Sequence, residues 1–340
     1  MDDTTSGTRN KRGDWTPNAP ASIAPVFVFP PKPLEFLKWL PAYFFPFNGF
    51  YALTTVIWWN WVIPDVQTMK TLAPGWILWL FAVNTVALFA FFGVFELRLY
   101  IRRAQGNHFK YNARWPSDHP SPAFWFQSQN LDNMLRTLLH AMPIWTALEV
   151  GILYAFANGY VPWLGFAQHP IYLFAFALLV PVIHEAHFFV LHWLLHTEFL
   201  YKIAHSVHHN SVNPSPYSSL SMHPIELTGY LGVALWHLIL PSNPLLAIYQ
   251  LHFAGFGAIP GHIGFDKIEL GGETSMDSHA YIHYLHHKNF EVNYGDGLIP
   301  FDKWFGTFHD GSAQGEARMQ ARYQAKKKRM NAAAEANKSA

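Results

Sequence analysis

Residues 75–99 read GWILWLFAVNTVALFAFFGVFELRL and contain no charged residue before their last four positions. A helix of this length, at 1.5 Å per residue, crosses the roughly 30 Å hydrocarbon core of a bilayer. Trp76 and Trp79 stand near its start, and Trp is enriched at membrane interfaces. A short turn separates this segment from residues 48–63, which are also apolar and uncharged. We therefore predict a transmembrane hairpin; a pair of buried helices in a large soluble protein is the alternative.

The composition of the 340-residue chain also suits a membrane better than water. Hydrophobic residues make up 51%, aromatic residues 17% and charged residues 13%, which is about half of the usual charged share. The many aromatic residues and the formal net charge of +1 exclude a strongly disordered chain. The chain has no Cys, which excludes disulfides and Cys-ligated zinc or iron–sulfur sites. No basic, aromatic-interleaved stretch indicates nucleic-acid binding, so we expect no nucleic-acid partner.

Two further pairs of apolar segments follow the first hairpin. Residues 138–183 contain no Lys or Arg, and Asn158-Gly159 divides them into a second hairpin. Residues 227–240 and 245–259 form a third pair, in which each arm is short for a crossing and is either interfacial or re-entrant. The predicted fold class is all-α, a multi-pass membrane bundle with about four to six apolar crossings or re-entrant segments.

Basic residues indicate which ends of these segments face the cytoplasm, because short cytoplasmic loops are enriched in Lys and Arg. One basic cluster follows the first hairpin and another lies near the C-terminus: Arg98, Arg102, Arg103, Lys110, Arg114 and Arg136, and then Arg318, Arg322 and residues 326–329. The second hairpin returns residue 184 onward to the same side. We predict that this region and the C-terminus are cytoplasmic, in a bacterial inner membrane rather than the endoplasmic reticulum. The basic tail could contact anionic membrane lipids there.

Histidines are concentrated in one part of the chain, since 15 of the 20 lie between residues 184 and 287. Ten of these 15 form an HxxxH motif, two HxxHH motifs and two isolated positions: His192 and His196; His205, His208 and His209; His283, His286 and His287; and the single His223 and His262. Positions i, i+3 and i+4 share one face of a helix. The three motifs therefore present two, three and three imidazoles that can converge on one cavity.

A metal site explains these motifs better than packing does, because burying eight imidazoles without partners would be costly. One structural zinc takes four ligands, so eight or more His indicate two metals. Imidazole ligands suit zinc, copper, iron or nickel. The chain lacks the Glu-x-x-His pattern of ferritin-like di-iron proteins and the zinc-protease motif. Glu185 lies two helical turns before His192 and shares its face. Four isolated histidines are expected to make ordinary core or polar contacts: His140, His169, His237 and His252.

The order of these motifs among apolar segments resembles that of the fatty acid hydroxylase/sterol desaturase superfamily. Residues 223–226, His-Pro-Ile-Glu, are similar to the His-Pro-x-acid element of that family, and His262 stands where the family has an isolated His. Asn293-Tyr294-Gly295 and residues 301–307, FDKWFGT, resemble its closing signature. The resemblance covers roughly residues 140–310.

The resemblance implies a cytoplasmic non-haem site with two iron ions and an enzyme that uses O₂ and two electrons. Such an enzyme hydroxylates or desaturates a lipid or a sterol-like substrate. The metal ligands that the resemblance implies are His192, His196, His205, His208, His209, His262, His283, His286 and His287, with His223 either a ligand or a residue behind the ligands. Glu185 is expected to support the ligands from behind, and His279 could support them as well. The chain has no flavin, haem-attachment or iron–sulfur motif, so electrons would come from a separate reductase or ferredoxin-like donor.

Two rival functions use the same residues. A non-catalytic membrane metal-binding or metal-transport protein would carry polar groups at mid-membrane, whereas these His cluster at the ends of segments. A bis-His haem electron carrier would have single His facing each other on paired helices rather than HxxHH triplets. The motifs do not distinguish hydroxylation from desaturation.

The sequence divides into four parts under this interpretation. Residues 1–33 form a Pro-rich tail that we predict to be disordered, without the apolar core of a signal peptide. Residues 34–137 hold the first transmembrane hairpin and a basic cytoplasmic loop. Residues 138–310 form the catalytic domain, and residues 311–340 form a basic cytoplasmic tail.

Overall fold

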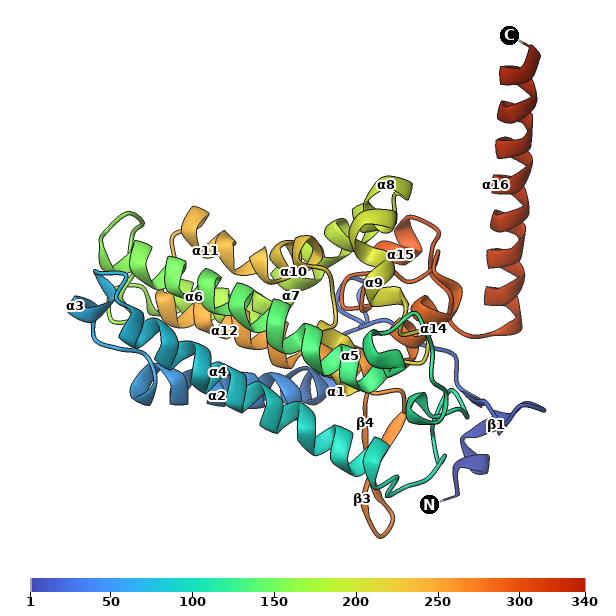
Figure 1. Cartoon of the computed structure of the whole chain (residues 1–340), viewed down its shortest axis with the longest axis horizontal. Helices are drawn as coiled ribbons and strands as arrows, with labels where there is room; N and C mark the ends of the chain where they lie inside the picture. Colours follow the sequence, from blue (N-terminus) through green and yellow to red (C-terminus); the bar gives the residue numbers. More distant parts are fainter. Residues whose placement is uncertain (1, 340) are drawn as a thin grey trace.

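A computed structural model describes residues 2–339 as a bundle of helices (Figure 1). Three of them are long and apolar enough to cross a membrane, and they confirm the prediction of an α-helical membrane-type bundle. They are α4 (Pro74–Phe95) continued by the π-helical turn η2 (Glu96–Ile101), α5 (Gln129–Arg136) continued by η5 (Thr137–Ala141) and α6 (Met142–Ala157), and α7 (Pro170–Leu195).

The other apolar segments form shorter helices. They are α2 (Phe47–Trp61), α10 (Pro224–Leu231), η8 (Gly232–Leu235), α11 (Trp236–Ile239) and α12 (Pro244–Phe256). The Asn243 side chain accepts a hydrogen bond from the backbone N–H of Leu245 at 2.9 Å, so α12 begins with a capped turn. Nearly every side chain of α12 is buried, and the helix packs against α2, α6 and α7. It therefore forms the centre of the bundle.

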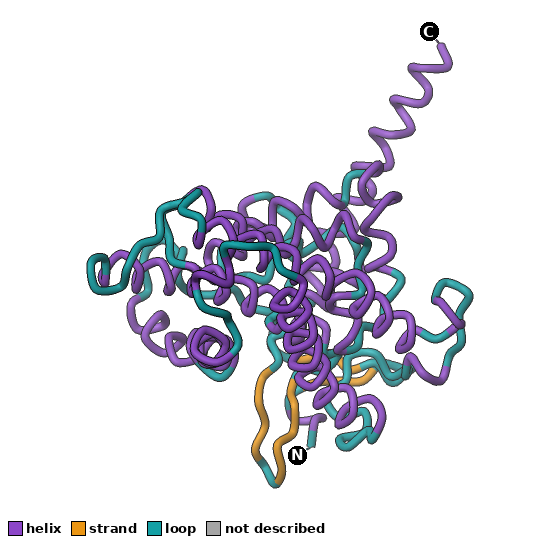
Figure 2. The backbone as a smooth tube through the Cα atoms, turned by 60° about the vertical axis from the view of Figure 1, so that its left-hand side comes forward, coloured by secondary structure: helices purple, strands orange, loops and turns teal. Residues whose placement is uncertain are grey.

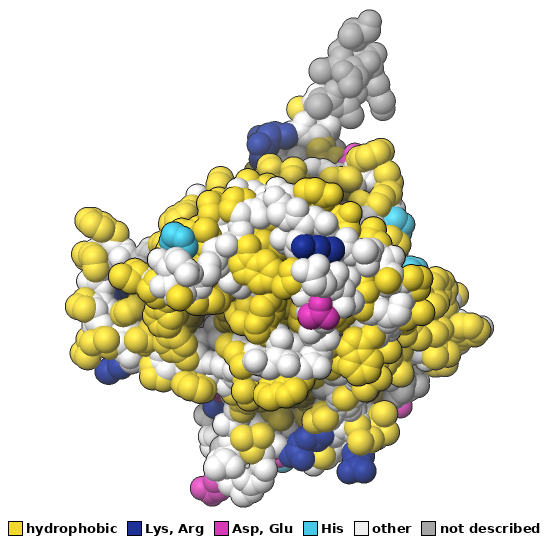
Figure 3. Space-filling view, turned by 90° about the vertical axis from the view of Figure 1, so that its left-hand side faces the viewer, with side chains coloured by type: hydrophobic (Ala, Val, Ile, Leu, Met, Phe, Trp, Pro, Cys, Tyr) yellow, Lys and Arg dark blue, Asp and Glu magenta, His cyan; other side chains and the backbone are white. Residues whose placement is uncertain are grey.

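One face of α4 is buried and the other is apolar and exposed. The buried positions recur every four residues, and the exposed positions between them carry aliphatic side chains: Trp76, Leu80, Asn84, Leu88 and Phe92 are buried, and Leu78, Val86 and Val94 are exposed. Figure 3 shows hydrophobic side chains over much of the end of the bundle near α3 (Val66–Met69) and α11. Such a surface suits contact with lipid rather than with water.

A buried polar chain links three helices inside the bundle. Trp58 Nε1 of α2 donates a hydrogen bond to Asn84 Oδ1 of α4 at 2.7 Å. The Asn84 amide donates to the carboxylate of Glu149 in α6. Because polar groups buried in an apolar environment need partners, this chain fixes the positions of α2, α4 and α6 relative to one another.

The remaining elements are short, apart from two helices near the ends of the chain. They are η1 (Asp3–Thr5), β1 (Gly7–Arg9), β2 (Trp15–Pro17), α1 (Pro33–Phe44), η3 (Pro116–Asp118), η4 (Trp125–Gln127), α8 (Glu198–Leu200), η6 (Tyr201–His205), α9 (Ser206–His209), η7 (Pro216–Leu220), α13 (Ala258–His262), β3 (Lys267–Gly271), β4 (Thr274–Asp277), α14 (Tyr281–Asn289), α15 (Phe301–Trp304) and α16 (Ala313–Ser339). The strands form two antiparallel hairpins, with Gly7 opposite Pro17 and Lys267 opposite Asp277. Figure 2 shows that α16 and the β3–β4 hairpin project from the body.

The N-terminal segment differs from the predicted disordered tail of residues 1–33. Residues 7–17 form the β1–β2 hairpin, and Trp15 is 1% exposed, with its ring against Phe109 and Tyr111. The backbone N–H of Ala24 donates to the carbonyl of Gly297 at 2.9 Å. The carboxylates of Asp3 and Asp14 also accept hydrogen bonds from the N–H groups of Phe109 and Ala113, both at 3.0 Å. Trp15 and these two carboxylates therefore anchor a segment whose average composition is polar and rich in Pro.

The division between residues 34–137 and 138–310 also differs from the structure, because a continuous helix runs from Gln129 to Ala157. The Ser128 side chain caps its start by accepting a hydrogen bond from the N–H of Leu131 at 3.3 Å. Arg136, expected in a cytoplasmic loop, lies inside this helix and pairs with Asp132 one turn earlier at 2.8 Å. The tail predicted for residues 311–340 contains the long helix α16.

Candidate metal centre

The three His motifs lie at one end of the bundle, near α9 and α14 (Figure 1). Together with the isolated His262, their side chains form two groups, and within each group the candidate ligand nitrogens lie within 4.8 Å of one another. The five-His group comprises His192, His196, His205, His209 and His286, and the four-His group comprises His208, His262, His283 and His287. All are buried except His196, which is partly buried.

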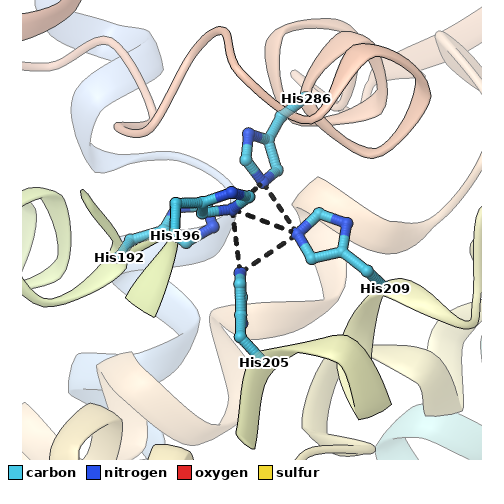
Figure 4. A group of neighbouring side chains, drawn as sticks. All are labelled: His192, His196, His205, His209 and His286. Atoms are coloured by element: carbon cyan, nitrogen blue, oxygen red, sulfur yellow. Dashed lines mark hydrogen bonds between the residues drawn. The ribbon is translucent and has the colours of Figure 1, made fainter. Parts of the chain in front are cut away.

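In the five-His group, four Nε2 atoms converge on one small volume (Figure 4). His196 Nε2 lies 3.0 Å from that of His205, 3.2 Å from that of His209 and 3.1 Å from that of His286. An imidazole nitrogen carries at most one proton, so these contacts cannot all be hydrogen bonds. Nitrogen ligands at about 2.0–2.2 Å from a single ion lie about 2.9–3.5 Å apart. The spacing therefore fits one metal ion.

The four-His group has the same geometry. His262 Nε2 lies 3.1 Å from those of His208 and His283 and 3.2 Å from that of His287. The His283 and His287 Nε2 atoms are 3.2 Å apart. Four nitrogens at this spacing fit a second ion. The groups adjoin each other, since the rings of His209 and His287 have centroids 4.8 Å apart.

Each HxxHH motif contributes His side chains to both the five-His group and the four-His group. In residues 205–209 the first and last His enter the five-His group, and the middle one, His208, enters the four-His group. In residues 283–287 the assignment is reversed, because only His286 enters the five-His group. Adjacent helical residues diverge by about 100°, whereas residues four apart share a face. The His-His pair in each motif therefore serves two centres rather than one.

Second ring nitrogens hold several of these imidazoles in place. Nδ1 of His192 lies 2.7 Å from the Tyr294 carbonyl, and Nδ1 of His286 lies 2.7 Å from that of Val292. Nδ1 of His262 lies 3.0 Å from the Ala258 carbonyl. A proton donated from Nδ1 leaves Nε2 with a free lone pair directed at the centre, as metal ligands require.

Burial keeps the ligands neutral. It lowers the pKa of His262 to about 4. Burial, and then the neighbouring imidazoles, hold the pKa of His205, His209 and His287 well below the usual range. Because only the neutral ring binds a metal, the folded chain presents ligands that need not lose a proton at neutral pH.

Residues 177–307 match a family model described as fatty acid hydroxylase, and both His groups lie inside this segment. This part of the chain is similar to members of the fatty acid hydroxylase/sterol desaturase superfamily. The resemblance found from the His motifs is therefore confirmed.

The relatives that match this chain include sterol and sphingolipid enzymes. The chain is 29% identical over 147 residues to the Delta(7)-sterol 5(6)-desaturase ERG3A of Gibberella zeae, covering 43% of this chain and 39% of the relative. It is 28% identical over 138 residues to sphinganine C4-monooxygenase 2 of Arabidopsis thaliana, covering 39% and 53%. The chain is also 24% identical over 234 residues to the Delta(7)-sterol 5(6)-desaturase erg3B of Aspergillus fumigatus, covering 66% of this chain and 65% of the relative. The chain thus spans between about two fifths and two thirds of these relatives, and no solved structure matches it.

Three predicted residues lie outside the two His groups. His223 is the N-terminal cap of α10, and its Nδ1 accepts a hydrogen bond from the N–H of Ile225 at 3.3 Å. His279 is exposed and lines a cavity next to the groups. Glu185 is buried, and its carboxylate accepts hydrogen bonds from the backbone N–H groups of Asp296 and Gly297, both at 3.1 Å. It therefore supports the loop that carries the Tyr294 carbonyl and contacts no ligand directly.

Glu226 is a supporting residue that the His motifs do not reveal. It is buried, and its Oε1 lies 2.7 Å from Nδ1 of His205. A carboxylate behind a His ligand orients the ring and raises its basicity. The only signal in the sequence is its place as the acid of the His-Pro-x-acid element, in which His223 is the more obvious candidate metal ligand.

We expect alanine substitutions to separate ligands from bystanders. His286→Ala and His287→Ala each remove a ligand nitrogen from one group, so each should lower the bound metal by about one ion per chain. His223→Ala should keep the wild-type content, because that ring lies outside both groups. Elemental analysis of purified protein measures this. A loss of metal in His223→Ala equal to that in His286→Ala would contradict the assignment.

Glu226→Gln should weaken metal binding by about 10- to 100-fold, because it removes the charge that orients and polarises His205. Competition with a chelator gives the affinity. Glu198→Gln is the matched control, since Glu198 is exposed and pairs only with Lys202, at 2.6 Å. Equal affinities in the two variants would show that Glu226 has no such role.

Proposed function

We propose that the protein is an O₂-dependent, non-haem di-iron oxidoreductase that hydroxylates or desaturates a lipid or sterol-like substrate. The observation that carries this proposal is the pair of adjoining His groups beside an apolar cavity, in a chain with three membrane-length helices. The names of the relatives support a sterol or a sphingoid lipid as the substrate class.

Iron is the proposed metal because the family uses it, while the nitrogen donors alone would also suit zinc, copper or nickel. When bound, the two ions would supply the oxidation of an unactivated C–H bond, which no side chain can carry out. In hydroxylation, the substrate, O₂, two electrons and two protons give an alcohol and water. In desaturation, the same inputs give an alkene and two waters. The electrons come from a separate reductase or ferredoxin-like donor.

The cavity supplies the place for the substrate. It has a volume of about 200 Å³ and reaches both His groups through His192, His205, His208, His262 and His283. Its other walls include Phe188, Leu195, Met222 and Phe253. Apolar walls bind a lipid chain or ring system, exclude water and hold one carbon near the metal groups.

We expect the purified, metal-loaded protein in lipid nanodiscs to hold about two irons per chain without haem absorbance. With a chemical reductant it should consume O₂ and convert a Δ7-sterol or sphinganine to a product detectable by mass spectrometry. A metal-transport or metal-storage protein would bind the metal and release it without O₂ uptake. Zinc alone, with no O₂ consumption under any reductant, would overturn the proposal.

We further propose that the His groups face the cytoplasm, which the predicted positive-inside arrangement supports. The chain has no Cys, so single Cys variants can be labelled without background. Lys70→Cys follows α3 at the end of the bundle away from α9 and α14, whereas Lys327→Cys lies in α16 (Figure 1). In intact bacterial spheroplasts an impermeant maleimide should label Lys70→Cys at once and Lys327→Cys only after permeabilisation. The opposite pattern would reverse the orientation.

A further inference from the structure

Two polar side chains in the cavity wall, away from the metal groups and Glu226, have a buried atom without a hydrogen-bond partner among the described residues. Tyr51, on α2, is 1% exposed, and its hydroxyl contacts no acceptor or donor among the described residues. His184, on α7, is 5% exposed, and its Nδ1 also lacks a partner in residues 2–339. Both residues line the cavity beside the His groups. Since buried polar groups are nearly always paired, a ligand in the cavity is the expected source of the missing bonds.

Other polar groups in the same wall are already paired within the protein. The Tyr230 hydroxyl donates to the Ala254 carbonyl at 2.9 Å, and the Ser219 hydroxyl donates to that of Pro216 at 2.6 Å. The Asn48 amide donates to the Tyr43 carbonyl at 2.5 Å. Unpaired atoms are also found on Glu226, at Oε2, and on the Nδ1 atoms of His208 and His283, but these residues belong to the metal groups and their support. Among the other described polar side chains of the wall, the unpaired buried atoms are those of Tyr51 and His184.

The two residues lie at a defined place relative to the metal groups. His184, Phe188 and His192 follow one another at intervals of one turn along α7, with ring centroids 6.0 Å and 4.8 Å apart. The ring of Phe253 packs against the rings of both His184 and Tyr51, with centroid distances of 5.0 Å and 5.7 Å. His184, Phe188 and His192 therefore lie along one face of α7. His192, which belongs to the five-His group, is about 12 Å from His184 along the helix axis.

The charge of the cavity restricts what can bind there. None of the described residues that line it is Lys or Arg, and its carboxylates are those of Glu226 and Asp296. A phosphate or carboxylate headgroup would be buried without a cation, which is costly. A neutral hydroxyl has one donor and two acceptor sites, so it can pair with a Tyr hydroxyl and an imidazole nitrogen together.

We propose that Tyr51 and His184 bind the hydroxyl group of a neutral lipid alcohol and thereby select which carbon lies near the His groups. This inference rests on the proposed function, since it assigns the substrate class of the same cavity. Tyr51 and His184 are positioning residues, because they lie away from the metal groups and act by holding the far end of the substrate.

The test compares two alcohols, a Δ7-sterol and octadecan-1-ol, with their methyl ethers. Binding to metal-loaded protein in nanodiscs is measured by Trp fluorescence, and turnover is measured where it occurs. The variants are Tyr51→Phe and His184→Phe, which keep an aromatic ring. Tyr217→Phe is the matched control, because Tyr217 lies outside the cavity wall and its hydroxyl already donates to the Phe89 carbonyl at 3.1 Å.

The wild-type protein should bind at least one alcohol about tenfold or more tightly than its ether, because the ether cannot donate. Tyr51→Phe and His184→Phe should each reduce that preference by about three- to tenfold, because each variant weakens binding of the alcohol and leaves binding of the ether unchanged. Tyr217→Phe should keep the wild-type preference. In turnover measurements the two cavity variants should raise the KM for the alcohol, and their metal content should equal that of the wild type.

The binding and turnover measurements separate this inference from the proposed function. Preferential alcohol binding that depends on Tyr51 and His184, without any O₂ uptake, would retain the inference and overturn the oxidase proposal. Turnover with equal alcohol-to-ether ratios in the wild type and both cavity variants would overturn the inference alone and indicate that water satisfies these groups. Binding of neither alcohol would also overturn it.

Discussion

The structure depends on directing the lone pairs of nine neutral imidazoles into two small volumes. At Nε2 separations of 3.0–3.2 Å these lone pairs repel one another, and burial prevents protonation from relieving the repulsion. A cation that accepts the lone pairs removes this cost, so metal binding and folding are thermodynamically coupled. Acidification opposes both, since the unfolded chain binds protons on His that the folded chain excludes. The surrounding elements are best understood as supports for this arrangement.

The main support is the loop of residues 292–297, which connects the metal groups to a membrane-length helix. Its carbonyls at Val292 and Tyr294 accept from the Nδ1 atoms of one ligand on α14 and one on α7. Asp302 holds the loop by accepting from the N–H groups of Tyr294 and Gly295, both at 2.9 Å, and Glu185 holds the next two residues. Buried carboxylates thus act on the site through backbone amides. The long helix α7 fixes both a ligand and the loop that orients it.

The sequence predicted what depends on local geometry and missed what depends on tertiary contacts. Helical spacing selected eight of the nine His that the structure brings together, because HxxxH and HxxHH set ring directions within one turn, and the family resemblance supplied the isolated His262. His223 lies outside both His groups because it precedes Pro224, the first residue of α10, and its ring caps that helix. Glu226 pairs with a residue 21 positions away, which no local pattern reveals. The N-terminal hairpin does not follow from average composition, because Trp15, Asp3 and Asp14 anchor it through contacts with residues about 100 positions away.

The many aromatic residues and the many His residues form adjoining parts of one site, which are the cavity wall and the two His groups. Phe188 stacks on His192 with centroids 4.8 Å apart and also forms the cavity wall, so the same ring packs a ligand and contacts the cavity. A rigid aromatic ring loses little conformational entropy on burial, and its contact with the imidazole restricts the ligand's rotamers. Because α7 also carries Glu185 and His184, one helix sets the distance between the metal groups, their supporting loop and the far end of the cavity. A shift of α7 by one residue would misplace all three at once.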